Sequence, residues 1–240
     1  MGNNPQKTQQ FRQGINEISS TQKEAFGTLR VTQDGRKFRY AKATAAAMEA
    51  GIACQMAVPT ANHFNRSAVA TAVGSIQVDV AVGATAVTAN QYDGGYLQIN
   101  AGTAGTIGRQ YLISSHTVSA AGSETITVNL AEPLATALVV TTDKLSLIPN
   151  PYNGVSVGAV AEPIAGICPV KVTASYYFWC QTGGIANAMI DNAVDAGSCL
   201  VGGGTGTLIL HLVNYLQPIV GYAIGIGITS ECKAAFLTID

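Results

Sequence analysis

The stretch Tyr176-Tyr177-Phe178-Trp179-Cys180-Gln181-Thr182-Gly183-Gly184 decides how the rest of the chain is interpreted. It contains the only Trp of the protein and its densest run of aromatic residues. The β-branched and aromatic residues from Val170 to Cys180 predict a strand, and Gly183-Gly184 predicts the turn that ends it. Apolar side chains alternate onto both faces of this strand. We therefore expect one face to line a core and the other to be covered by more protein.

The composition indicates a surface with few charges. The chain has 240 residues, of which 48% are hydrophobic and only 11% are charged, whereas about 25% charged residues is usual. Such a surface is poorly suited to a free monomer and is easier to understand if an assembly covers much of it. The length allows one large β domain or two smaller ones.

The N-terminal part differs from the rest in charge and polarity. Residues 1–50 hold eight basic and four acidic residues, although the whole chain carries a net charge of -1. Residues 1–27 are rich in Gln, Asn, Ser and Thr and have few apolar anchors, so they cannot fold alone. They are either a frayed terminus or an arm that becomes ordered on a neighbouring subunit. The excess of positive charge is too small for a nucleic-acid-binding domain.

The cysteines and the apolar runs place further limits on the class of protein. Five cysteines, an odd number with no C-x-x-C pair, are interpreted as reduced, small apolar residues of a protein made in a cytoplasm. The first 20 residues show no signal-peptide pattern. The longest apolar run, Pro218–Ile228, is far shorter than the roughly 20 residues that a membrane-spanning helix needs. We expect no membrane partner.

Short alternating segments separated by turn residues predict an all-β fold with little helix. Asp34-Gly35 predicts a hairpin between 28–32 and 36–42, and the Ala-rich piece 43–50 fits a short helix or a strand. Further predicted strands cover 76–80, 96–99, 110–113, 125–128, 144–148, 154–161, 199–201, 208–213, 220–228 and 234–239. Their spacing is typical of an antiparallel barrel or sandwich.

The predicted organisation has three parts. An extended polar N-terminal arm covers 1–27, the main β domain covers 28–73 together with 149–240, and a small β subdomain covers 74–148. The loop Pro149–Gly154, with two prolines and Asn-Gly, marks one boundary. A further turn is expected over Pro163–Pro169.

No motif in the sequence carries recognisable chemistry. Gly202–Thr207 lacks the Lys-Ser/Thr ending of a phosphate-binding loop, and a strand follows it where a helix is needed. His63, His116 and His211 have no partners at metal-ligand spacing, and Gly-x-Ser-x-Gly is absent. We predict no catalytic, metal-binding or cofactor-binding residues.

Several motifs resemble the tailed-phage head decoration, or cement, proteins. The segment Tyr177-Phe178-Trp179-Cys180-Gln181-Thr182-x-Gly184 is similar to their Tyr-x-Trp-x-Gln-Thr-x-Gly, and Asp34-Gly35-Arg36-x-Phe38-Arg39-Tyr40 is similar to their Asp-Gly-Arg-x-Phe-Arg-Tyr. Further similar pieces occur in the same order between them, at 95–99, 110–116 and 132–134. The likeness runs over about residues 28–205. Phe178 and Cys180 stand where the family usually has smaller residues.

The resemblance implies a non-enzymatic, β-rich virion protein on the capsid surface. The implied partners are the major capsid protein and further copies of the chain, as a homotrimer, with neither nucleic acid nor membrane. The residues expected at interfaces are Arg36, Lys37, Phe38, Arg39, Tyr40, Tyr176, Tyr177 and Trp179. Two alternatives stay open: a virion adhesin that binds glycans with Tyr176, Tyr177 and Trp179, and a hydrolase whose His and Cys or Asp meet only in the folded chain.

Overall fold

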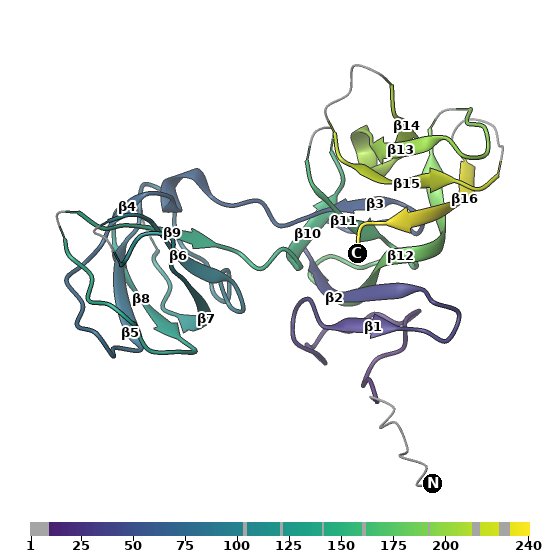
Figure 1. Cartoon of the computed structure of the whole chain (residues 1–240). Coiled ribbons are helices and arrows are strands. Elements are labelled where there is room, and N and C mark those ends of the chain that lie inside the picture. Colours follow the sequence, from purple (N-terminus) through teal and green to yellow (C-terminus); the bar gives the residue numbers. More distant parts are fainter. Residues whose placement is uncertain are drawn as a thin grey trace, which may run out of the picture. The chain divides into compact units, whose positions relative to one another are not determined.

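The computed structural model describes residues 10–102, 105–120, 122–140, 142–159, 162–191, 193–212, 217–225 and 231–240. The fold is all-β, as predicted, with sixteen strands and two short 3-10 turns in this described part (Figure 1). The chain forms two compact units. Unit 1 comprises residues 1–55 and 156–240, and unit 2 comprises the insertion 56–155.

The strands of unit 1 close into two rings that share one strand. The first ring runs β2–β10–β3–β11–β12 and returns to β2, and the second runs β12–β14–β13–β15–β16 and returns to β12. Strand β10 begins in the last three residues of unit 2 and ends in unit 1. Strand β1 pairs with β2 outside the rings. The bounds are β1 Leu29–Val31, β2 Lys37–Ala43, β3 Ala53–Gln55, β10 Asn153–Val157, β11 Ile164–Ile167, β12 Tyr177–Ile190, β13 Cys199–Gly202, β14 Leu208–Leu210, β15 Ile219–Ala223 and β16 Glu231–Thr238.

The shared strand β12 is longer than the sequence predicts. It does not end at Gly183-Gly184 but continues for 14 residues to Ile190. Its first half pairs with β2 and its second half pairs with β16. The register with β2 shifts between Gln181 and Gly183, and Gly184 has φ +77°, a conformation that glycine adopts easily. The two glycines therefore form an irregularity inside one strand, where the pairing partner changes.

The hairpin at Asp34-Gly35 is confirmed, whereas the short helix after it is not. Gly35 adopts φ +84° between β1 and β2. In the Ala-rich piece, Met48 forms a β-bridge with Val172 and donates its amide to the Val172 carbonyl at 2.9 Å. Pairing with a distant segment outweighs the high helix propensity of alanine. Likewise Ile164–Ile167, expected as a turn, is strand β11.

The described part of the N-terminal segment packs on its own chain. Ser19 and Tyr177 exchange backbone hydrogen bonds of 3.0 and 2.8 Å, and Gln13 is almost fully buried. Residues 10–27 therefore cover the first half of β12 and do not extend away as an arm. Residues 1–9 lie outside the described part.

Unit 2 is a six-stranded antiparallel sheet in the order β4-β9-β6-β7-β8-β5. A bridge from Ala68, just after β4, to Val80 in β5 joins its two edges. Seventeen buried residues form its core. The bounds are β4 Arg66–Ser67, β5 Gln77–Ala81, β6 Tyr96–Ala101, β7 Gln110–His116, β8 Thr125–Leu130 and β9 Lys144–Ile148, with 3-10 turn η1 at Ala61–His63.

Unit 2 begins earlier than the expected subdomain 74–148. Residues 56–73 belong with it because β4 pairs with β9 and Ala68 pairs with Val80. Its far boundary, after Val155, lies beside the proline loop. In unit 1, β14 ends at Leu210 and β15 at Ala223, and the last residues expected for these strands, 213 and 226–228, lie outside the described part.

Candidate functional site

The basic residues of the β1–β2 hairpin are bonded within the chain. Arg36 Nε lies 2.7 Å from Asp34 Oδ2, and Lys37 donates to the Asp240 backbone carbonyl at 2.9 Å. Arg39 holds the Asp240 carboxylate with two hydrogen bonds, at 2.6 and 2.9 Å. These bonds hold the pKa of Asp240 below its usual value. The hairpin therefore presents less free positive charge than its sequence indicates.

Three of the expected interface residues form an internal aromatic cluster. Phe38, Tyr40 and Trp179 are fully buried. Gln13 accepts hydrogen bonds from two of them: the Trp179 indole donates to its carbonyl at 3.0 Å, and the Tyr40 hydroxyl donates to its side-chain Oε1 at 2.8 Å. Phe11 packs edge-on to Trp179 at 5.1 Å. Burial thus assigns these three rings to the core of unit 1.

The remaining two expected residues, Tyr176 and Tyr177, are half-buried. The Tyr177 ring stacks with Phe26, at 6.0 Å, and with Tyr40, at 6.1 Å. The Lys42 ammonium lies 5.4 Å from the same ring. Tyr177 therefore has three partners in the chain, and the ring is not an open platform for a sugar.

An apolar row that sequence reasoning missed crosses the second ring of unit 1. Ile185 of β12 lies opposite Phe236 of β16, which lies opposite Tyr222 of β15, and Tyr222 lies opposite Cys199 of β13. The Phe236 and Tyr222 rings stack at 5.3 Å and 14°. Ile185 is 59% exposed and Tyr222 41%. We call these four residues the apolar row. Each of them comes from one of four adjacent strands, and none of them is charged.

Uncharged residues continue the apolar row along β12 and β16. Asn187 pairs with Ala234, and Met189 pairs with Cys232. Beside them lies a hollow of about 410 Å³, whose lining includes Ile185, Asn187, Ala234, Cys232 and Arg36. In the sequence, this face corresponds to every second residue after Gly184. The pattern can be recognised only if strand β12 is continued through Gly183-Gly184.

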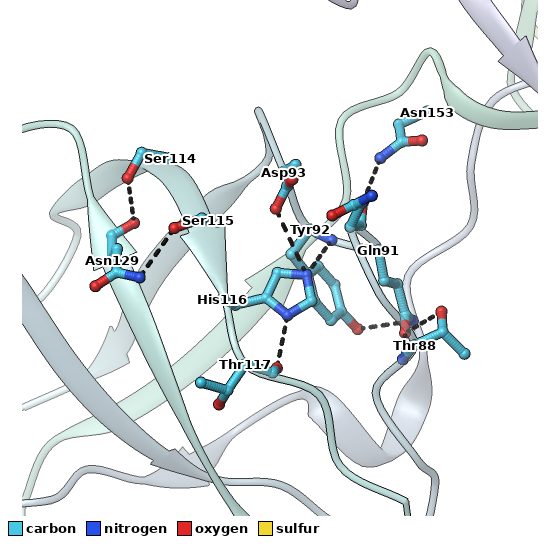
Figure 2. A network of polar contacts seen from close by, with 11 residues as sticks. Thr88, Gln91, Tyr92, Asp93, Ser114, Ser115, His116, Thr117, Asn129 and Asn153 are labelled. Atoms are coloured by element: carbon cyan, nitrogen blue, oxygen red, sulfur yellow. Dashed lines mark hydrogen bonds and ion pairs between the residues drawn. The ribbon is translucent and has the colours of Figure 1, made fainter. Parts of the chain in front are cut away.

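A polar network in unit 2 surrounds Tyr92 (Figure 2). The His116 Nε2 accepts the Tyr92 amide at 3.1 Å, and its Nδ1 lies 2.8 Å from the Thr117 carbonyl. Since a carbonyl only accepts, Nδ1 carries the proton and the imidazole is neutral. By the same reasoning His63 donates from Nε2 to the Thr85 carbonyl and accepts the Tyr92 hydroxyl at Nδ1.

Hydrogen bonds within the chain hold both histidines of the network in place. Both nitrogens of each histidine are occupied by groups of the chain, so neither ring has a nitrogen free for a substrate. Burial raises the pKa of Tyr92 to about 12, which keeps its hydroxyl protonated. Asp93 Oδ1, 3.7 Å from His116 Nε2, is buried without a hydrogen-bond partner. Its desolvation raises the pKa of Asp93.

The glycine-rich segment after β13 also serves the fold. The amides of Gly203 and Gly206 donate to the carbonyls of Thr207 and Gly158, at 2.9 and 2.8 Å. Strand β14 follows the 3-10 turn η2, Gly204–Gly206. These amides are therefore occupied, and no helix N-terminus is present here to hold a phosphate.

Within the described residues, no cluster of three or more His, Cys, Asp or Glu is arranged to hold a metal ion. None of the helical segments described is long and apolar enough to cross a bilayer. The candidate functional site is the apolar row together with the uncharged residues that continue it along β12 and β16. Compared with known proteins, the chain matches no protein family, no curated protein and no solved structure.

Proposed function

We propose that the protein is a structural virion component, a capsid decoration protein that binds the outer surface of the assembled head and stabilises contacts between major capsid protein subunits. The observation that carries the proposal is the apolar row, an exposed and uncharged strip across four strands of unit 1. Exposed apolar patches mark protein-binding surfaces. The row suits a contact between copies of the chain, because such a contact needs no complementary charge.

The motifs that resemble the decoration proteins support the same function. They form neighbouring strands of the first ring: Tyr40 lies opposite Trp179, and Phe38 lies opposite Gln181. Two of the similar motifs therefore meet in one structural element, the β2–β12 pair. A protein that binds only the assembled shell stabilises that shell by mass action.

The glycan-binding alternative has no support from the geometry. It requires open rings at Tyr176, Tyr177 and Trp179, but Trp179 is fully buried and Tyr177 stacks with Phe26 and Tyr40. The hydrolase alternative requires a histidine with a free nitrogen, which neither His63 nor His116 provides.

The first test is the mass of the purified protein in solution. We expect a trimer, three times the chain mass of 24.7 kDa, by sedimentation equilibrium. Ile185→Lys places a charge in the apolar row and should give a monomer while changing the free energy of unfolding by less than about 0.5 kcal/mol. The matched control is Ile76→Lys in unit 2, where Ile76 is similarly exposed at 56% and the trimer should persist.

The second test is binding to the head. Expanded heads of the phage that encodes the chain, stripped of this protein, should cosediment with the wild type and more weakly with Ile185→Lys. A wild-type monomer that stays in the supernatant would overturn the proposal.

A further inference from the structure

Three of the five cysteines meet in the core of unit 1. Cys54 of β3, Cys168 just after β11 and Cys180 of β12 are all fully buried, whereas Cys199 and Cys232 are exposed. The three come from segments far apart in the sequence, so their meeting is a product of the fold. The sequence alone predicts only reduced, small apolar residues.

The pairing of β3 with β11 sets the geometry of the three thiols. Cys54 lies opposite Gly166, and the Cys168 amide donates to the Ile52 carbonyl at 2.9 Å. Cys54 and Cys168 are thus diagonal neighbours across two antiparallel strands, a position from which side chains on one face reach each other. Their sulfur atoms lie 2.9 Å apart, within about 1 Å of a disulfide bond length.

Cys180 occupies a different position in the cluster. A Cβ atom built on Gly166 would lie 2.6 Å from Cys180 Sγ, so this thiol fills the space that the glycine leaves open. Cys180 approaches from β12, on the other side of β11. It contacts the pair without lying between its two sulfurs.

We infer that Cys54 and Cys168 form an intrachain disulfide when the folded protein meets a small two-electron oxidant of the peroxide class, with Cys180 left as a thiol. The Cys54 thiolate attacks hydrogen peroxide, the O–O bond breaks, hydroxide leaves and takes up the proton that Cys54 lost on ionisation, and Cys54 becomes a sulfenic acid. The Cys168 sulfur then attacks the Cys54 sulfur, the S–O bond breaks and water leaves with the Cys168 proton. Two thiols lose two electrons, and one peroxide is reduced to two waters.

The environment of Cys54 favours it as the thiol that reacts first. Hydrogen bonds from the Cys168 and Cys180 thiols hold the pKa of Cys54 below its ordinary value, against the opposing effect of burial. The same interactions raise the pKa of both neighbours. The thiolate is the nucleophilic form of cysteine. Peroxide is small enough to enter through local openings of the core that exclude larger reagents.

The bond would have a topological consequence. Residues 54 and 168 flank the whole of unit 2, residues 56–155. The disulfide would therefore fasten β3 to β11 at the base of the insertion and close a loop that contains the second unit. It would restrict the unfolded chain and so raise the denaturant midpoint of unit 1.

The test uses the full chain carrying Cys199→Ser and Cys232→Ser, which removes both exposed thiols. After hydrogen peroxide treatment and quenching, the denatured protein is alkylated and weighed. We expect the polypeptide itself to lose about 2 Da, the two hydrogens of a new disulfide. The number of alkylated thiols should fall from three to one. Trypsin separates the three cysteines into peptides 43–66, 145–171 and 172–233. The linked product should join 43–66 to 145–171.

Two variants give matched controls in the same background. Cys180→Ala should still form the link, and Cys168→Ala should not. Since the mapping is done on a protein with an intact cluster, it does not depend on either variant folding. Three free thiols after oxidation, or a link that involves peptide 172–233, would overturn the inference.

Discussion

The strongest prediction concerns Gln13, whose side chain joins the N-terminal segment to the barrel. Its amide nitrogen donates to the carbonyls of Glu17 and Tyr177, at 2.7 and 3.0 Å, and its Oε1 accepts the Tyr40 hydroxyl at 2.8 Å. Gln13→Ala removes all three bonds. The net value of such a bond is about 0.5–1.5 kcal/mol. The expected loss in free energy of unfolding is therefore about 1.5–4.5 kcal/mol.

Trp179 provides the assay, because it is the only Trp and lies under Gln13. Urea unfolding followed by its fluorescence reports on unit 1. With a slope of about 2–3 kcal/mol per molar urea, the midpoint should fall by about 1 M. Gln10→Ala, at an exposed position of the same segment, should leave the midpoint unchanged. If the two variants unfold at the same urea concentration, residues 10–27 are not part of the core and the reasoning is refuted.

Two further predictions concern the second ring and the polar network. Gly221→Ala would place a Cβ atom 2.1 Å from the Phe236 carbonyl oxygen. It should therefore lower the free energy of unfolding, measured with urea, by about 1–3 kcal/mol. Gly225 has open space around it, so Gly225→Ala should leave the free energy of unfolding almost unchanged. Because the folded state raises the pKa of Asp93, its stabilising contribution exists only at low pH and is lost as the pH rises through the folded pKa. Asp93→Asn should therefore raise the thermal midpoint at pH 7, with the gain shrinking towards pH 4; a gain that grows on acidification would contradict this sign.

Local sequence patterns predict the elements that are determined by residues close together in the sequence. The Asp34-Gly35 hairpin and the five strands of unit 2 between residues 74 and 148 follow from turn residues and alternation. The course of β12 does not. Gly183-Gly184 has the composition of a turn, yet β2 on one half and β16 on the other hold it in a strand. Partners that lie more than 40 residues away are invisible to a local pattern.

The candidate site was harder to predict for a related reason. The aromatic run and the basic hairpin have the composition of an interface. Whether Trp179 or Tyr40 is exposed, however, depends on Gln13, which lies about 165 residues before Trp179 in the sequence. The apolar row is spread over four strands, with one residue from each. No window of the sequence contains it, so only the strand register could bring it together.

The two rings that share β12 also set the order in which the chain acquires structure. In unit 2 all pairings fall within one continuous segment, and two of the five, β6–β7 and β7–β8, join strands that are neighbours in sequence. The first ring must join β2 to β12 across about 140 residues, and neither ring can close before residues 177–190 are available. Since contacts of long sequence separation form slowly and synthesis proceeds from the N-terminus, unit 2 should fold on the ribosome while β2 and β3 still wait for their partners.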